Sequence, residues 1–261
     1  MPSYQETARQ NFIKELEARE SPEAWNAYKK EKIESVMGKL DYPKCEKFAD
    51  YLNRRFMDAA MANNAVGISQ RWTACSDDEK IEFAQKIVDT LIRLLDSDIQ
   101  YNHVQTYNND GGEYKKTNDF FDGIYKNEIA TYIHNFVKIK VKKSDNGLMG
   151  ITKDRQLHIN LDWPLYKGFE LFLMDLRHEM MHMVDIYISQ ISVLDPDVRM
   201  TSIRYYIGGD DSDFQLYKEN PLELNANLKR REFRIMCTEM ISNAICHKIK
   251  SNQIPYAHER T

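Results

Sequence analysis

Residues 169–188 read FELFLMDLRHEMMHMVDIYI, a stretch that carries a fold signal and a chemical one. Nearly every residue outside its central motif is apolar, which is typical of an α-helix buried on most sides. The central motif is the HEMMH sequence of residues 178–182. Residues four apart share one face of a helix, so His178 and His182 can bind a single Zn²⁺ ion. Glu179 projects beside them, where it can reach a water molecule on the metal and act as a general base.

A pair of core histidines with satisfied hydrogen bonds is the structural alternative to a metal site. An accidental HExxH motif would however stand among solvated residues such as Lys, Glu and Gln, not in an apolar helix. Asp175 and Asp185 lie three residues outside the two histidines, where a carboxylate can accept the second ring N–H of a ligand and fix its tautomer. The sequence therefore favours a metal site.

A catalytic zinc site needs a third protein ligand and an open fourth position. Asp185 is on the correct helix face, but a rise of about 1.5 Å per residue carries this short side chain too far from the metal. We therefore expect the third ligand from a second helix. That helix is predicted to begin with Asn220 as N-cap and Pro221 at its first position, and its apolar periodicity continues to Ile245.

Glu223 is the candidate ligand in this second helix. Ala226, three residues later, is small enough to let two helices approach each other around a metal. Glu223 also stands at the position where a capping box onto the Asn220 backbone would place it, so a purely structural role is its main alternative. Glu219 and Glu239 are the other possible ligands.

The HEMMH motif with Asp185, followed by YKENPLELNA at residues 217–226, resembles the zincin metallopeptidases of gluzincin type. It looks most like the bacterial toxin and secreted-effector zincins, which include the anthrax-lethal-factor-like peptidases. The similarity covers roughly residues 147–245. The resemblance implies one Zn²⁺ per chain held by His178, His182 and Glu223, with Glu179 as general base. The chain departs from the metzincin pattern, which places Gly and a third ligand soon after the second His, and from peptide deformylase, which uses a Cys ligand.

The pattern of helices and strands changes near residue 98. We expect a helical N-terminal region over residues 1–97 and a zincin-like catalytic domain of α+β class over residues 98–261. Predicted helices before the boundary cover residues 4–19, 22–37 with Ser21 as N-cap, 43–61, and 77–95 with a capping box between Ser76 and Glu79.

Three short strands are predicted after this boundary. Val137, Ile139 and Val141 alternate with lysines, which is the period-two pattern of a half-exposed strand. Two further strands are expected over residues 148–151 and 156–161. We expect the last strand to form the sheet edge and to bind an extended peptide as an additional strand.

Four residues are candidates for stabilising the oxyanion of the proposed reaction. They are His158, Tyr205, Tyr206 and Tyr217. A lone His in a strand is more often a packing or surface residue, and with 15 tyrosines in the chain no single tyrosine stands out. The sequence leaves the choice among the four open.

Composition narrows the class of protein. A chain of 261 residues with 42% hydrophobic content can bury a substantial core, and a net charge of −4 offers no case for nucleic-acid binding. Residues 1–20 lack an apolar core segment and no stretch approaches the length of a membrane span, so neither a signal peptide nor a membrane anchor is expected. Four cysteines without regular spacing are expected as reduced core thiols: Cys45, Cys75, Cys237 and Cys246.

The leading functional hypothesis is a zinc-dependent endopeptidase acting on a protein or peptide substrate. As a bacterial effector or toxin, it would be exported without a cleaved signal peptide and would act in a host or target cytosol. A housekeeping cytoplasmic zinc peptidase or amidase for small peptides is the second hypothesis. The third is a non-enzymatic helical interaction protein in which residues 1–97 do the work. The sequence does not determine the oligomeric state.

Overall fold

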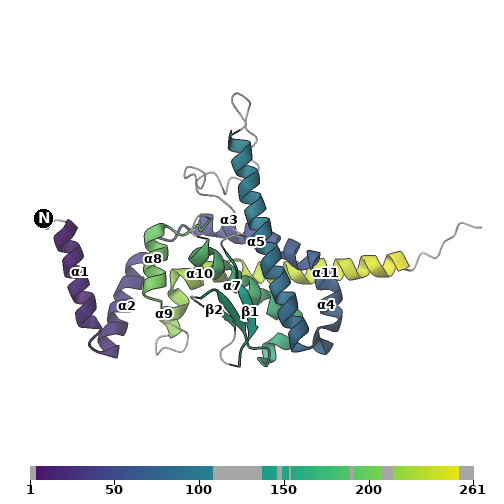
Figure 1. Ribbon diagram of the computed structural model, residues 1–261, viewed down its shortest axis with the longest axis horizontal. Coiled ribbons are helices and arrows are strands. Elements are labelled where there is room, and N and C mark those ends of the chain that lie inside the picture. Colours follow the sequence, from purple (N-terminus) through teal and green to yellow (C-terminus); the bar gives the residue numbers. More distant parts are fainter. Residues whose placement is uncertain are drawn as a thin grey trace, which may run out of the picture. The chain divides into compact units, whose positions relative to one another are not determined.

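The described part of the chain consists mostly of helices, with one small sheet (Figure 1). The computed structural model describes residues 4–107, 137–145, 149–152, 154–188, 191–206 and 214–252. Over these residues the protein is mostly helical with a mixed three-stranded sheet, which confirms the predicted α+β class. The helices before the sheet are α1 (Tyr4–Ala18), α2 (Pro22–Met37), α3 (Tyr42–Ala62), α4 (Ala65–Arg71), the 3₁₀ helix η1 (Trp72–Ala74) and α5 (Asp77–Tyr107).

The sheet and the later helices follow in chain order. They are β1 (Lys140–Lys143), β2 (Met149–Ile151), β3 (Gln156–Ile159), the 3₁₀ helix η2 (Pro164–Lys167), α7 (Phe169–Tyr187), α8 (Pro196–Arg204), α9 (Phe214–Glu219), α10 (Pro221–Asn227) and α11 (Arg230–Asn252).

The helix starts follow the local signals of the sequence. Ser21 Oγ accepts a hydrogen bond of 3.0 Å from the N–H of Ala24, which makes Ser21 the N-cap of α2. At the start of α5, Glu79 N–H donates to Ser76 Oγ over 3.2 Å and Ser76 N–H donates to Glu79 Oε2 over 2.8 Å. Both the predicted N-cap and the predicted capping box are therefore confirmed.

Helix α5 extends twelve residues beyond its predicted end at residue 95, and tertiary contacts explain the difference. Asp98 accepts hydrogen bonds from both Arg55 Nε and Arg55 Nη2 over 2.6 Å, and one from Tyr51 Oη over 2.7 Å. These partners on α3 bind a carboxylate that lies three residues past the predicted end.

The single helix predicted from Asn220 to Ile245 is wrong, because the chain breaks between α10 and α11. Lys229 has a φ of 56°, in the left-handed region that ends helices. Two carbonyls at this break accept hydrogen bonds from other helices: Ala226 O from Arg177 Nη1 over 2.7 Å, and Lys229 O from Asn53 Nδ2 over 3.3 Å. Partners distant in sequence therefore satisfy the end of α10 and the start of α11.

The sheet has the order β1-β3-β2, so the prediction that the last strand forms the edge is wrong. Strand β3 lies in the middle, parallel to β1 and antiparallel to β2. Leu157 on β3 is fully buried between its partners Val141 and Ile151, so both neighbouring strands cover apolar side chains of β3. The true edges are β1 and β2.

Helix α5 covers the backbone at the edge of β1. Gln85 Nε2 donates to the carbonyl of Ile139 over 2.9 Å, and the N–H of Val141 donates to Gln85 Oε1 over 2.8 Å. The side-chain amide of Gln85 thus takes the place of a neighbouring strand, which is one way in which proteins protect an exposed sheet edge.

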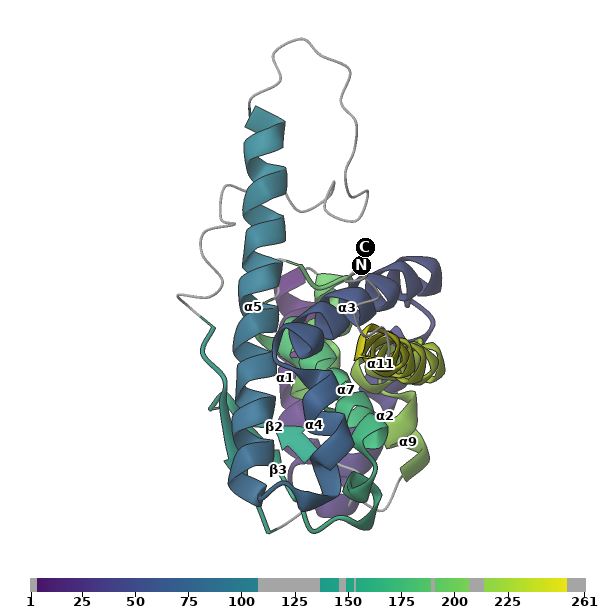
Figure 2. The ribbon, with the colours of Figure 1, turned by 90° about the vertical axis from the view of Figure 1, so that its right-hand side faces the viewer.

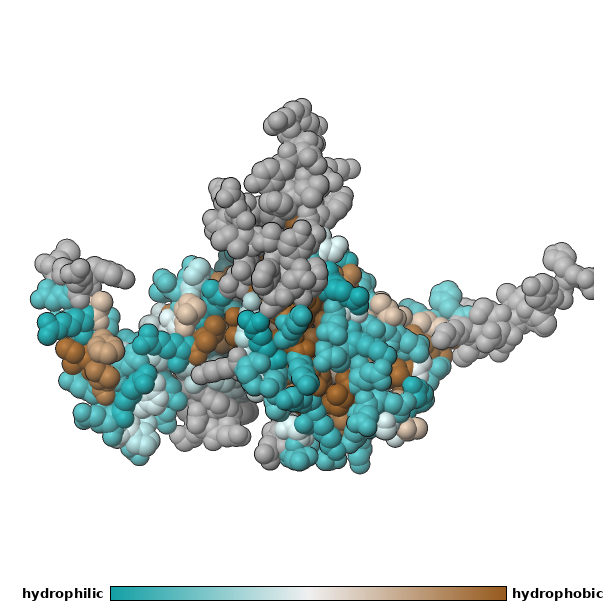
Figure 3. Space-filling view, viewed as in Figure 1, coloured by the Kyte–Doolittle hydropathy of each residue, from teal (hydrophilic) through white to brown (hydrophobic). Residues whose placement is uncertain are grey.

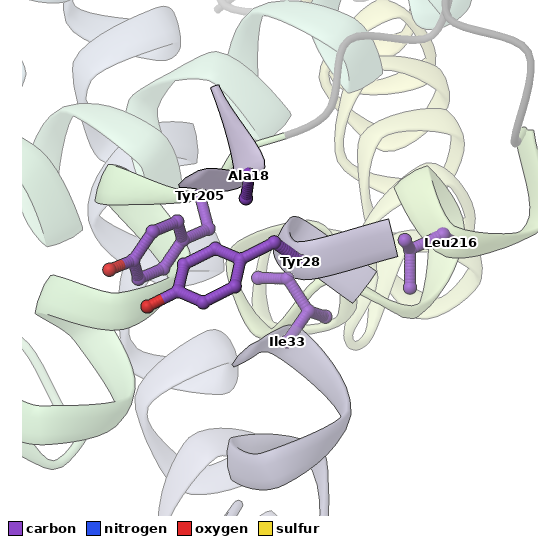
Figure 4. Packing of buried hydrophobic residues seen from close by; sticks show 5 residues of the cluster. All are labelled: Ala18, Tyr28, Ile33, Tyr205 and Leu216. Atoms are coloured by element: carbon purple, nitrogen blue, oxygen red, sulfur yellow. The ribbon is translucent and has the colours of Figure 1, made fainter. Parts of the chain in front are cut away.

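The chain separates into two compact units whose boundaries differ from the expected division near residue 98, which falls inside α5. The first unit comprises residues 1–45 and 193–225, and the second comprises residues 46–192 and 226–261. The first unit has a small core in which residues of α1 and α2 meet residues that follow them by more than 170 positions. Figure 4 shows this core: Ala18, Tyr28, Ile33, Tyr205 and Leu216.

A buried carboxylate lies next to the core of the first unit. Glu15 on α1 accepts hydrogen bonds from Arg204 over 2.6 Å, Arg19 over 2.7 Å and Tyr205 over 3.1 Å. Burial raises the pKa of Glu15, but the bonds from Arg204, Arg19 and Tyr205 outweigh burial and hold the pKa below its ordinary value. This cluster joins α1 to the end of α8.

The second unit is built around α7, which packs against β2, η2 and α11 (Figure 2). The start of α7 lies in an aromatic cluster in which the Trp72 ring contacts Phe169 and Phe172 at centroid distances of 5.2 and 4.7 Å. Trp72 Nε1 also donates to the carbonyl of Tyr166 over 2.8 Å. These contacts bury the amino-terminal part of α7 and direct its HEMMH segment toward the sheet.

The cysteine prediction is confirmed for three of the four residues. All four are free thiols, with Cys45, Cys75 and Cys237 buried and Cys246 exposed. Burial raises the pKa of Cys237 to about 12. None of the helices that the structure describes combines the length and apolarity needed to cross a bilayer.

Candidate metal centre

The HEMMH motif lies in the middle of α7, at a position that is buried despite its polar side chains. His178, Glu179 and His182 are 8%, 7% and 7% exposed, and the methionines between them are fully buried. Polar groups that are buried to this extent require hydrogen bonds or a metal. The prediction of a buried helix from Phe169 onward is confirmed.

The two histidine rings converge on one point. Their Nε2 atoms lie 3.0 Å apart, and the ring planes are nearly perpendicular at 88°. Two nitrogens bound to one tetrahedral zinc at roughly 2.0–2.1 Å would lie about 3.3 Å apart, close to this spacing. Among the described residues, His178, Glu179 and His182 form a group whose potential ligand atoms all lie within 4.8 Å of one another. Two imidazoles suit a zinc ion, and the third member of the group, Glu179, is the predicted general base.

Glu179 is held by the sheet. Its Oε2 accepts a hydrogen bond of 3.0 Å from the backbone N–H of Ile151 on the edge strand β2. Two turns later on α7, the hydroxyl of Tyr187 donates to the carbonyl of Thr152. Helix and edge strand are therefore joined at two points, and one of these points is the carboxylate predicted to act as the base.

The two aspartates that flank the motif have different surroundings. Asp185 is fully buried, and its Oδ1 accepts from Ser192 Oγ over 2.7 Å. Asp175 forms an ion pair with Arg230 on α11. The structure thus gives Asp175 a role in joining α7 to α11, in contrast to the predicted contact with a histidine.

Glu223 lies on α10 in the first unit, and it is 1% exposed. Its Oε1 accepts a hydrogen bond of 2.6 Å from the hydroxyl of Tyr206. Asn220 caps α10 as predicted, since its Oδ1 accepts from the N–H of Leu222 over 2.9 Å. The backbone N–H of Asn220 donates to the carbonyl of Tyr217, so the alternative in which Glu223 closes a capping box is not found.

The alternative ligands have other surroundings. Glu219 accepts a hydrogen bond from Gln215 on its own helix, and Glu239 is exposed on α11. Neither of them belongs to the group of potential ligands at the HEMMH motif, and neither does Glu223, which lies in the first unit. The third ligand therefore stays a prediction, and Glu223 is the residue that the resemblance implies.

The structure gives the oxyanion candidates different surroundings. Tyr205 donates to Glu15, and Tyr206 donates to Glu223. Tyr217 packs its ring edge against Tyr206 at a centroid distance of 6.1 Å. His158 is half-buried on the central strand β3, on the face opposite to the buried Leu157 and Ile159.

A buried arginine beside the motif was missed by the sequence reasoning. Arg177 is fully buried, and it donates to Asn53 Oδ1 over 2.7 Å, to Ala226 O over 2.7 Å and to Ala49 O over 3.4 Å. Burial lowers the pKa of Arg177 to about 10, so the side chain stays protonated at neutral pH. Its position in an otherwise apolar stretch was the signal in the sequence, because a charge there needs buried partners.

Comparison with protein-family models, with curated proteins and with solved structures found no match.

Proposed function

We propose that this protein is a zinc-dependent endopeptidase with a zincin-like site, hydrolysing a peptide bond in a protein substrate. The observation that carries the proposal is the 3.0 Å spacing of the His178 and His182 Nε2 atoms beside the Glu179 carboxylate on a buried helix. The same spacing allows a hydrogen bond between two core histidines, and the zinc measurements below distinguish this alternative from a metal site. The resemblance of the motif to the zincins supports the same function.

His178 and His182 would hold the zinc, with Glu223 as the predicted third ligand. A bound zinc ion lowers the pKa of water toward about 7 and polarises a carbonyl group. Glu179 would take a proton from the attacking water and deliver it to the leaving amine. The bond from Ile151 to Oε2 orients the Glu179 carboxylate, which supports this role.

Strand β2 is the edge that we propose for substrate binding. The N–H of Thr152 donates to the carbonyl of Gln156 over 2.8 Å, so strand alternation turns the N–H of Met149 away from β3, while the N–H of Ile151 on the same edge is bound to Glu179. The edge of β1 is covered by Gln85, whereas β2 lies beside Glu179. A peptide added to β2 as an extended strand would pass the predicted base, which favours a segment of a protein as substrate.

The resemblance to secreted effectors and toxins supports a further part of the proposal. In that case the substrate belongs to a host or target cell. This part is carried by the resemblance alone, and it is tested separately by export assays.

Metal content tests the proposed function directly. Purified protein should contain about one zinc per chain, and His178→Ala or His182→Ala should lose most of it because each removes one protein ligand. His158→Ala is the matched control, since His158 lies on the sheet face opposite to the buried side chains, and this variant should keep its zinc. Wild-type protein that stays metal-free after zinc loading and dialysis would contradict the proposal.

A further inference from the structure

A groove of about 570 Å³ lies between α5 and the chain that enters β1. Its α5 wall includes Asp89, Ile92 and Arg93, which share one face of the helix because Asp89 stands three and four residues before the other two. Residues 137–140 form the opposite wall. Both walls belong to the second unit, and none of the described residues that line the groove belongs to the HEMMH motif.

The groove combines an apolar floor with basic side chains. Three aliphatic side chains of its lining are buried: Ile92, Val137 and Ile139. Three basic side chains of its lining are exposed: Arg93, Lys138 and Lys140. Hydrophilic residues cover most of the surface over α5 and β1, with small hydrophobic areas between them (Figure 3).

The positive charges of the groove are not balanced by acidic groups. Arg93, Lys138 and Lys140 form no ion pair with any residue that the structure describes. Arg93 donates instead to two neutral acceptors, the carbonyl of Asp89 over 3.3 Å and Thr90 Oγ1 over 3.1 Å. The chain as a whole has a net charge of −4, so this local excess of positive charge does not follow from its composition. Charge complementarity therefore favours an acidic partner.

Gln85 joins the groove to the edge of the sheet. Its Nε2 donates to the carbonyl of Ile139 over 2.9 Å and to Asp89 Oδ1 over 3.0 Å, while its Oε1 accepts from the N–H of Val141 over 2.8 Å. The backbone at this edge thus pairs with a group from outside the sheet. An extended peptide that followed the edge from Gln85 toward Val137 would lie in the groove.

We propose that this groove binds an acidic segment of a partner protein in an extended conformation. Alternate side chains of an extended peptide point to opposite sides, so aliphatic side chains can meet the floor while acidic ones meet Arg93, Lys138 and Lys140. Nucleic acid is disfavoured, because the described lining contains no aromatic ring on which a base can stack. The inference does not rest on the proposed function.

Binding of a fluorescent peptide of alternating Glu and Val to the full-length protein tests the proposal. Fluorescence anisotropy should show binding that weakens with added salt, and a peptide with Lys in place of each Glu should not bind. Lys138→Glu combined with Lys140→Glu should lower the affinity about tenfold or more, because two attractive charges become repulsive. The melting temperature should stay near the wild-type value, since both side chains are exposed.

Lys47→Glu combined with Lys167→Glu is the matched control. Both lysines are exposed outside the groove, so this variant has the same net charge as the groove variant and should bind the acidic peptide as the wild type does. Failure of the acidic peptide to bind, or equal weakening in the two variants, would overturn the proposal. It would also be overturned if a single-stranded oligonucleotide bound in preference to the peptide and the groove variant lost that binding. Zinc content is measured on both variants and should not change, which keeps this test separate from that of the metal centre.

Discussion

The backbone N–H of Ile151 donates a hydrogen bond of 3.0 Å to Oε2 of Glu179. The edge strand of the sheet and the predicted general base are thus in direct contact. In a peptidase this contact would place the peptide-binding edge and the proton acceptor in a fixed relation, because neither depends on a flexible loop. The same bond restricts the Glu179 side chain to one orientation.

Glu179→Gln separates catalysis from binding. Glutamine keeps a carbonyl oxygen that can accept from Ile151, so zinc and the strand contact should both be retained. It cannot take a proton from water, and turnover should fall by about 10²–10⁴-fold or more. Zinc analysis together with cleavage of a randomised peptide library measures both effects. A variant that cleaves as fast as the wild type would show that Glu179 is not the base.

Glu223→Ala and Asp185→Ala distinguish a ligand from a supporting residue. Loss of a direct ligand should cost more than a hundredfold in zinc affinity and abolish cleavage, whereas loss of Asp185 should cost about 10–100-fold at most. Zinc titration and melting curves of both variants make the comparison. The assignment would be reversed if Asp185→Ala lost its zinc while Glu223→Ala kept it.

Arg177→Met should destabilise the second unit strongly. The change leaves Asn53 Oδ1 and the carbonyl of Ala226 without their buried donor, at a cost of roughly 1–3 kcal/mol for each group. Arg177→Lys should recover only part of the loss, because an ammonium group cannot reproduce the fork of the guanidinium. Denaturant unfolding provides the measurement.

The exposed Arg71, which pairs with Glu79, is the control for Arg177. Arg71→Met should change the unfolding midpoint far less, since an exposed ion pair contributes little. Equal midpoints for Arg177→Met and the wild type would mean that the buried network does not support the helix.

Glu15 should make the stability of the first unit depend on pH. Its pKa in the folded protein is lowered from 4.5, so its contribution is complete well above pH 4.5 and is lost as the pH falls through the lowered value. Glu15→Gln should reduce stability at neutral pH and flatten this acid dependence. Melting curves between about pH 3 and pH 7 compare the two proteins. An identical acid dependence in the variant would assign the effect to other groups.

Local signals in the sequence predicted the starts of the helices and the core of the candidate site. Ser21 and the Ser76–Glu79 pair act over three residues, and the HEMMH spacing acts over one helical turn. Interactions of this range are present in any chain that carries these residues. Sequence alone was therefore sufficient to bring His178, Glu179 and His182 together.

Longer-range features were decided by tertiary structure. Past residue 95 of α5, Asp98 accepts hydrogen bonds from Arg55 and Tyr51. At the end of α10, the carbonyls of Ala226 and Lys229 accept hydrogen bonds from Arg177 and Asn53. No Gly marks that break. These partners are more than 40 residues apart in the chain, and no local pattern reports them.

The order of the strands was also decided by tertiary structure. Buried and partly buried side chains alternate along β3, because only one face of the strand is fully covered. Its position between β1 and β2 does not follow from this pattern. When one face of a strand is buried, apolar residues alternate in its sequence. Hydrogen bonding along the edge of a strand uses backbone groups, which do not depend on the side chain. The sequence by itself determined which side chains face the core and brought together the three side chains of the predicted metal site. Tertiary structure alone decided that β2 is the strand beside Glu179. The physical reason is that strands pair through backbone groups, which are the same whatever the side chains are.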